Sequence, residues 1–144
     1  MIKNNLQISS FVADTHCFIW HLTGDTRMEG MAKHAFERAD RGEIIIYLSV
    51  ITPIELLYLY EKQKISRALW SRFSSVFTSR RTDSYQVVDL TYDLAKWIKD
   101  VPRKIIPDLP DRIIAATALS YNLPLITRDH KIREWGGIKT VWSI

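Results

Sequence analysis

Between Asp108 and Asp129 the chain reads DLPDRIIAATALSYNLPLITRD, and this stretch is the most informative about the fold. From Asp111 to Ser120 it is apolar at most positions after the first two, which predicts a helix buried on nearly every face. The run from Leu123 to Thr127 is short and apolar, which predicts a buried strand. A buried helix followed directly by a buried strand indicates a sheet whose faces are covered by helices.

The rest of the chain repeats this alternation. A strand is predicted at Ile8 to Ala13, immediately before Asp14, and the clearest strand runs from Glu43 to Ser49. Further predicted strands are Gln86–Leu90 and Thr140–Trp142. The predicted helices are Thr15–Leu22, Met28–Ala39, Ser66–Thr78 and Tyr92–Lys99, and one more has Pro53 in its first turn and ends near Glu61. A loop is predicted over Val101–Pro110. Continuous apolar strands separated by helices predict an α/β fold with a central parallel sheet of four to five strands, in one domain spanning residues 1–144.

Composition narrows the class of protein. The single cysteine, Cys17, excludes an intrachain disulfide and a CxxC-type zinc site. The first residues lack the long apolar segment of a signal peptide, and no apolar run approaches the ~18–20 residues of a membrane-spanning helix. We therefore expect a soluble, cytoplasmic protein without a membrane partner.

Acidic residues occur at the ends of predicted strands. Asp14 closes the first strand, and Asp129 follows the strand that ends at Thr127. Taken singly, Asp14 is interpreted as a helix N-cap and Asp129 as an ordinary loop residue. In open parallel sheets, however, ligands bind at the carboxyl ends of the strands, which gives both acids a second interpretation as site residues.

Two further acids lie at the start of apolar helices. Glu55 is in the apolar segment Ile51 to Tyr60, where an ionised carboxylate is costly unless it is paired, bound to a metal or exposed on a narrow solvent strip. Asp111 opens the helix of the stretch quoted first, and Asp108 lies three residues before it. The pair could be a capping arrangement, with one acid at the N-cap and the other at the third helical position. Capping explains one of the two acids, but two acids before a buried helix exceed what a cap needs.

The four acids together predict a metal site if the sheet brings them to one edge. Crowded carboxylates repel one another unless cations lie between them, and oxygen-only ligands favour Mg²⁺ or Mn²⁺. Two such ions, ~3.5–4 Å apart, can cleave a phosphodiester by activating water and stabilising the leaving oxygen. With these four acids neutralised, twenty Lys and Arg face twelve remaining Asp and Glu, which suits a polyanion; a solvated surface without a partner is the alternative.

Four motifs follow one another along nearly the whole chain: Ala13-Asp-Thr-His16 with Trp20 after it, Ser49-Val-Ile-Thr-Pro-Ile-Glu55, Asp108 to Leu119, and Pro124-Leu-Ile-Thr-Arg-Asp129. Together they resemble the PIN-domain nucleases, and more closely the VapC-type toxins of bacterial toxin–antitoxin pairs. The resemblance implies a PIN-like α/β/α sandwich and endoribonuclease activity that depends on Mg²⁺ or Mn²⁺. It also implies inhibition by a cognate antitoxin and frequent homodimerisation.

The resemblance also implies roles for individual residues. The catalytic and metal-binding acids fall on Asp14, Glu55, Asp111 and Asp129, with Asp108 as a further candidate ligand. Ser49 and Thr127 fall where hydroxyl residues support the site.

Basic residues beside these acids suggest contacts to the substrate. Arg112 and Arg128 are candidates for RNA phosphate contacts because guanidinium binds phosphate in a fork, and the alternative is a salt bridge with a neighbouring acid. His16 and His130 are interpreted as substrate-adjacent or structural rather than as ligands, because hard ions prefer oxygen.

Several alternatives remain open at this point. The apolar run Leu56 to Tyr60, with Trp70, Phe73 and Phe77, is interpreted as core, and the alternative is a groove for an antitoxin segment. The functional alternatives are a housekeeping RNA-processing nuclease and a catalytically inert RNA- or protein-binding module. A phosphatase with an aspartate nucleophile is disfavoured because it needs an acid two residues after Asp14, where this chain has His16.

Overall fold

The computed structural model describes residues 10–78 and 84–142, and within these ranges the strands form one five-stranded sheet. The strands are β1 (Ser10–Ala13), β2 (Ile45–Ser49), β3 (Tyr85–Val88), β4 (Leu125–Ile126) and β5 (Thr140–Val141). Their order is β3-β2-β1-β4-β5, and every pairing is parallel. The predicted parallel sheet is therefore confirmed; Ile8 and Ser9, predicted in the first strand, lie outside the described residues.

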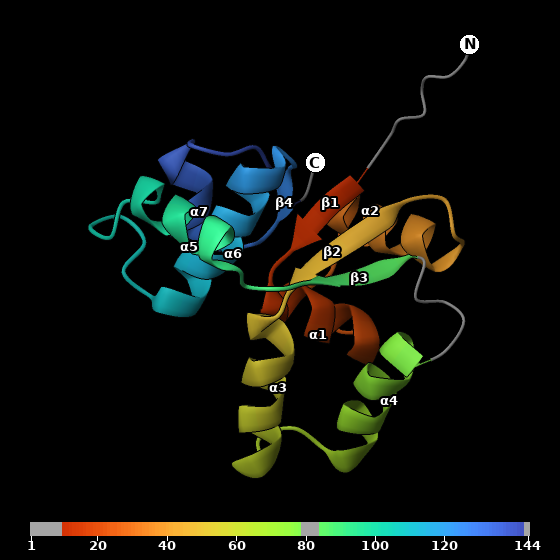
Figure 1. Cartoon of the computed structure of the whole chain (residues 1–144). Helices are drawn as coiled ribbons and strands as arrows, with labels where there is room; N and C mark the ends of the chain where they lie inside the picture. Colours follow the sequence, from red (N-terminus) through yellow and green to blue (C-terminus); the bar gives the residue numbers. More distant parts are fainter. Residues whose placement is uncertain (1–9, 79–83, 143–144) are drawn as a thin grey trace.

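Helices cover both faces of this sheet (Figure 1). They are α1 (Thr15–Thr23), α2 (Gly30–Asp40), α3 (Ile51–Glu61), α4 (Arg67–Thr78), α5 (Tyr92–Lys96), the 3₁₀ helix η2 (Trp97–Asp100), α6 (Leu109–Tyr121) and α7 (His130–Trp135). Helices α5, α6 and α7 lie on one side, and α1, α2 and α4 lie on the other. The arrangement is an α/β/α sandwich.

Several predicted boundaries were wrong. The helix predicted from Tyr92 to Lys99 divides into α5 and η2, and α6 begins at Leu109 rather than at Asp111 because Asp108 already serves as its N-cap. The strand predicted at Gln86–Leu90 is β3, which starts one residue earlier and ends at Val88. Helix α7 was not predicted.

Each face of the sheet has its own hydrophobic core, because successive strand residues point to opposite sides. In β1, Ala13 packs with α1 and α2, while Val12 packs with α6 and α7. Phe18 anchors α1 within the first core, with its ring 5.7 Å from the ring of Phe73 and 5.6 Å from that of Tyr85. The helix that follows β1 is thus held firmly at the carboxyl end of that strand.

The strand register fixes which residues meet at this end. Ala13 is paired with Leu48 of β2 and with Ile126 of β4. The residues that come next in the three strands are Asp14, Ser49 and Thr127, so these three are neighbours along one edge of the sheet. The edge predicted to carry the site is therefore built from β2, β1 and β4.

The apolar run of α3 is only partly core. Leu56 is fully buried and Phe73 of α4 is nearly so, which confirms the core interpretation for these two residues. Leu57 and Tyr58, in contrast, are 42% and 59% exposed. Within the described ranges, no helix is long and apolar enough to cross a membrane.

Candidate active site

Asp14 stands at the junction of β1 and α1 and is 7% exposed. One carboxylate oxygen accepts a hydrogen bond from the Cys17 backbone N–H at 2.9 Å, which makes it the N-cap of α1, and the other accepts one from the Thr127 hydroxyl. Burial raises the pKa of Asp14, while these hydrogen bonds act in the opposite direction. The residue is both a helix cap, as interpreted from the sequence, and part of the edge site.

Thr127 connects Asp14 to Asp129. Its fully buried hydroxyl donates to Asp14 and accepts a hydrogen bond from the Asp129 backbone N–H at 3.0 Å. Asp129 in turn is the N-cap of α7, with its carboxylate 3.0 Å from the Ile132 backbone nitrogen. Asp129 is therefore not the ordinary loop residue of the first interpretation, and Thr127 holds both acids in position.

Glu55 approaches the same edge from α3. The Thr15 hydroxyl donates to its carboxylate at 2.7 Å, and Thr52 lies 2.9 Å from the Thr15 oxygen. Burial is the main reason why the pKa of Glu55 is raised, and the charges of Asp108 and Asp14 raise it further. The sequence interpretation did not identify Thr15 and Thr52 as supports of Glu55. The signal that could have identified them is that each is a hydroxyl residue at the start of a predicted helix that carries or follows one of the acids.

Asp108 and Asp111 form the capping arrangement expected at the start of α6. The Asp108 carboxylate accepts a hydrogen bond from the Asp111 backbone N–H at 3.1 Å, and Pro110 lies in the first turn. Asp111 is left without such a role for its own carboxylate, and burial with the charges of the neighbouring acids raises its pKa to about 7. The acids that act on it are, in order of effect, Asp108, Asp129, Asp14 and Glu55.

The acids predicted from distant motifs are therefore brought together at one edge. A pocket of about 310 Å³ lies there, lined by Asp14, His16, Trp20, Asp111, Arg128 and Asp129. Within residues 10–78 and 84–142, however, no three Asp, Glu, His or Cys side chains are placed to hold one metal ion together. Asp14, Asp111 and Asp129 line this acidic pocket without forming a closed ligand shell, and Glu55 and Asp108 are not among its lining residues.

Ser49 and Arg112 have structural hydrogen bonds near this pocket. Ser49 is fully buried, and its hydroxyl accepts a hydrogen bond from the Ile51 backbone N–H at 3.1 Å at the start of α3. The Arg112 guanidinium donates to the backbone oxygens of Ile98 and Val101 at 2.9 and 3.1 Å. Arg112 thus ties α6 to the end of η2, and this contact is neither of the two that the sequence suggested.

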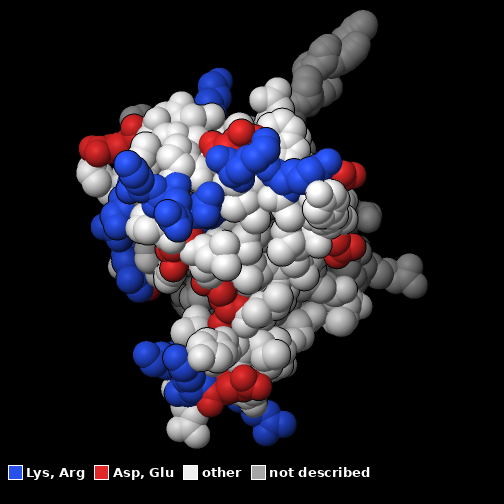
Figure 2. All heavy atoms as spheres, turned by 60° about the vertical axis from the view of Figure 1, so that its left-hand side comes forward, with Lys and Arg blue, Asp and Glu red and all other residues white. Residues whose placement is uncertain are grey.

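Arg128 remains beside the acids. It is exposed, lines the pocket and lies 5.8 Å from the ring centroid of Trp20. His16 also lines the pocket, whereas His130 pairs with Glu134 on α7 at 3.0 Å. The surface seen in Figure 2 has Lys and Arg gathered across its upper part, with a line of acidic groups below them.

The family assignment follows from the sequence over the same region. The PIN domain family model matches residues 11–137, a range that contains all four acids. This chain belongs to the PIN-domain family.

Individual relatives agree with the PIN assignment. The chain is 25% identical over 131 residues to ribonuclease VapC22 of Mycobacterium tuberculosis (strain ATCC 25618 / H37Rv), covering 88% of this chain and 92% of the relative. The resemblance to VapC-type proteins is thus confirmed.

Solved PIN-like structures confirm the fold. A chain of VapBC2 from Rickettsia felis, bound to a promoter DNA fragment, is similar with a TM-score of 0.70 and 15% identity over 94% of this chain and 100% of that one. A chain of a toxin–antitoxin complex from Klebsiella pneumoniae gives a TM-score of 0.63 and 22% identity over 93% of this chain and 99% of that one.

Proposed function

We propose that this PIN-domain protein is an endoribonuclease that depends on Mg²⁺ or Mn²⁺ and acts as the toxin of a toxin–antitoxin pair. One observation carries the catalytic part of the proposal: Asp14, Asp111 and Asp129 share one small pocket, and burial, followed by repulsion from the other acids, raises the pKa of Asp111 to about 7. A cluster of this kind is stabilised by a cation, and among the described residues that line the pocket the basic ones are His16 and Arg128.

The donor set fits a hard divalent cation. All the candidate ligands are carboxylate oxygens, and Mg²⁺ commonly binds through one or two carboxylates while it keeps several waters. An open pocket with acids on different elements suits that mode better than a closed shell does. We propose Asp14, Glu55, Asp111 and Asp129 as the metal-binding acids, with Asp108 nearby chiefly as the cap of α6.

Each acid would have a distinct part in this site. When bound, divalent ions supply activation of the attacking water and stabilisation of the leaving oxygen of the phosphodiester. Hydrogen bonds from Thr127 and from the Cys17 backbone keep Asp14 oriented, and Thr15 does the same for Glu55. Arg128 is the cation at the rim that would bind an RNA phosphate, whereas the guanidinium of Arg112 is already bonded to backbone.

An antitoxin partner is supported by the exposed apolar side chains of α3. Ile54, Leu57 and Tyr58 are 54%, 42% and 59% exposed, on a helix whose other side packs on α4. The similar structures named above are themselves toxin–antitoxin assemblies. Homodimerisation, expected from the family resemblance, stays a prediction.

RNA cleavage with Mg²⁺ or Mn²⁺ tests the proposal, repeated with EDTA and with Asp14→Asn. We expect cleavage in the presence of the ions and its loss in both other cases. Asp93→Asn is the matched control, because this carboxylate is 90% exposed on α5 and pairs only with the neighbouring Lys96 among the described residues. Cleavage that survives both EDTA and Asp14→Asn would contradict the metal-site account.

Expression in cells separates a toxin from a housekeeping nuclease. A toxin arrests growth when it is expressed alone and not when it is expressed with its neighbouring reading frame. Unimpaired growth in both cases, with cleavage intact in vitro, would favour the housekeeping alternative.

A further inference from the structure

Trp20 forms an aromatic wall of the carboxylate pocket. It lies on α1, six residues after Asp14, and lines the pocket together with Asp14 and Asp111. Its indole meets the edge of Trp142 at a centroid distance of 5.9 Å and an interplanar angle of 67°. The ring of His16 lies 6.1 Å away and also borders the pocket. An acidic pocket for ions alone has no need of such a wall.

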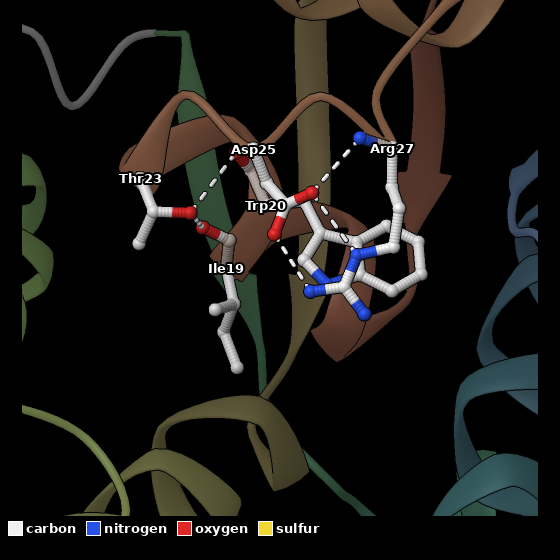
Figure 3. Close-up of polar contacts among 5 residues, drawn as sticks. All are labelled: Ile19, Trp20, Thr23, Asp25 and Arg27. Atoms are coloured by element: carbon white, nitrogen blue, oxygen red, sulfur yellow. Dashed lines mark hydrogen bonds and ion pairs between the residues drawn. The ribbon is translucent and has the colours of Figure 1, made fainter.

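The indole is held in place by a fixed guanidinium. The Arg27 guanidinium carbon lies over the ring, 4.6 Å from its centroid. Asp25 binds this guanidinium through two contacts, 2.6 Å to the Arg27 Nη2 and 3.0 Å to its Nε, and also accepts a hydrogen bond from the Arg27 backbone N–H at 2.8 Å (Figure 3). Two charge-assisted bonds in fork geometry are a strong and well-oriented contact. Arg27 is therefore committed to supporting Trp20.

The end of α1 contributes further rigidity beside the ring. The Thr23 hydroxyl donates to the backbone oxygens of Ile19 and Trp20 at 3.0 and 3.3 Å, and the Asp25 backbone N–H donates to the Trp20 carbonyl at 2.9 Å (Figure 3). These bonds fix the Trp20 backbone, and the Arg27 guanidinium packs over its indole, before any ligand arrives. A ligand that stacks on a preorganised ring loses less conformational entropy than one that must order it.

Arg128 makes the contrasting contact with the same ring. Its guanidinium lies 5.8 Å from the Trp20 centroid, close to the ~6 Å limit of a cation–π interaction. Across residues 10–78 and 84–142, no ion pair joins Arg128 to an acid, and the residue is exposed. This contact is weak enough for Arg128 to leave the ring and bind a phosphate, while a base takes its place on Trp20.

We propose that Trp20 is the base-binding residue of the site: a nucleobase of single-stranded RNA stacks on its indole while Arg128 binds an adjacent phosphate. The inference rests on the proposed ribonuclease function and adds how the substrate is held. A pocket of about 310 Å³ is at the small end of ligand sites and suits one unstacked base rather than a duplex. Stacking makes Trp20 a binding residue, distinct from the carboxylates.

The role of Trp20 in base stacking is tested by comparing the binding of two RNA strands that carry the same charge, one with bases and one without. In Mg²⁺, fluorescence anisotropy measures the Kd of a short single-stranded oligoribonucleotide and of a strand of the same length with internal abasic ribose-phosphate units, using Asp14→Asn protein to prevent cleavage. Loss of one stacked base corresponds to roughly 5- to 150-fold in affinity. We expect a preference of this size for the base-bearing strand, its disappearance in Trp20→Leu, and its retention for the most part in Trp20→Phe. Trp97→Leu, which removes a 41% exposed indole from a different pocket, should keep the preference.

Each result has one meaning. A preference that survives Trp20→Leu, or an equal loss for both strands, contradicts base stacking on Trp20. If Trp20→Leu does not fold, the absence of any preference in the parent Asp14→Asn protein still overturns the inference. Failure of the wild-type protein to cleave any RNA with Mg²⁺ or Mn²⁺ would instead overturn the proposed function, and the two failures are therefore distinguishable.

Discussion

Asp25 and Asp111 are two aspartates in opposite electrostatic situations: Asp25 binds the guanidinium that lies over Trp20, and Asp111 lines the pocket that Trp20 borders. Asp25 is bound by the Arg27 guanidinium and backbone, and these contacts lower its pKa to about 2. Among the described residues, Asp111 receives no hydrogen bond from a Lys or Arg; burial, and after it the charges of Asp108, Asp129 and other acids, raise its pKa to about 7. The chain thus pairs the Asp25 carboxylate with a guanidinium, whereas the Asp111 carboxylate lies among other acids.

This contrast distinguishes a carboxylate that stabilises the fold, Asp25, from one that is placed to bind a ligand, Asp111. The charge of a surface acid that is paired with a guanidinium is already neutralised and needs no bound ion. Buried acids that repel one another reduce the stability of the ion-free protein, and a bound cation reverses that effect. Perturbed pKa values in a pocket, with a stated physical cause, are typical of functional sites.

Removal of an acid from the pocket should have the largest effect. Asp111→Asn keeps the shape of the side chain but removes a charge that would bind the ion, so we expect RNA cleavage to fall at least about 100-fold, since metal-assisted charge stabilisation is worth several kcal/mol. Steady-state cleavage of one defined RNA measures this. The exposed Asp93→Asn should stay within about twofold of wild type, and similar losses in both variants would contradict the contrast.

Removal of a support should have the next largest effect. Thr127→Val deletes the hydroxyl that donates to Asp14 and accepts from the Asp129 backbone, and we expect a loss of about 10- to 100-fold in metal affinity or activity. Thr117→Val is the matched control, because Thr117 is also fully buried but its hydroxyl bonds only to the Ile113 backbone oxygen among the described residues. Equal losses in the two variants would mean that Thr127 acts through stability alone.

The stability of the ion-free protein should depend on pH through Asp111. Its folded pKa of about 7 is above the ordinary value of 3.8, so the folded state binds the proton more tightly and stability falls as pH rises from about 4 to about 7. A shift of about three pKa units corresponds to about 4 kcal/mol, and solvent screening of this half-buried group reduces the expectation to about 1–2 kcal/mol.

Thermal unfolding in EDTA at pH 5 and pH 8 measures this effect. We expect a lower Tm at pH 8 for the wild type and a smaller difference for Asp111→Asn. The raised pKa values of Asp14 and Glu55 act in the same direction, so some dependence on pH should remain. A wild-type Tm that rises between these pH values would contradict the repulsion among the acids.

Removal of the paired acid Asp25 should have the smallest effect on stability, and its dependence on pH should have the opposite sign to that of Asp111. Because the pKa of Asp25 is lowered to about 2, its contribution to stability is present above pH 4 and is lost as pH falls toward 2. Asp25→Asn should therefore lower Tm slightly at pH 7 and hardly at all near pH 2, as followed by circular dichroism. A higher Tm for Asp25→Asn at pH 7 would show that the Arg27 pair is not stabilising.

Much of the fold could be predicted from sequence because its strands are continuous apolar runs. Strand β2 and helix α6 are the clearest cases, since their apolar residues leave few alternatives. Helix α7 was missed because it is six residues long, too short for a helical period, and Asp129 at its N-cap was interpreted as a loop residue. Gly136, which ends it with a φ of 72°, was the signal that would have identified it.

The positions of the acids at one edge of the sheet could be predicted, and the hydrogen bonds around them could not. Asp14 and Asp129 follow strands, so the topology alone brings them to one edge. The bond from Thr15 to Glu55 joins residues 40 positions apart, and no local pattern encodes it. The contact of Asp25 with Arg27 was not predicted, although an Asp two residues before Arg27 is typical of a turn in which the side chain binds the backbone.

Calorimetric titration of Mn²⁺ into the wild-type protein and into the double variant Asp14→Asn, Asp111→Asn, at pH 8, tests the central claim most directly. We expect binding to the wild type and at least about tenfold weaker binding to the double variant. Equal Mn²⁺ affinity in the two proteins, with RNA cleavage by the wild type intact, would contradict a metal site formed by these acids.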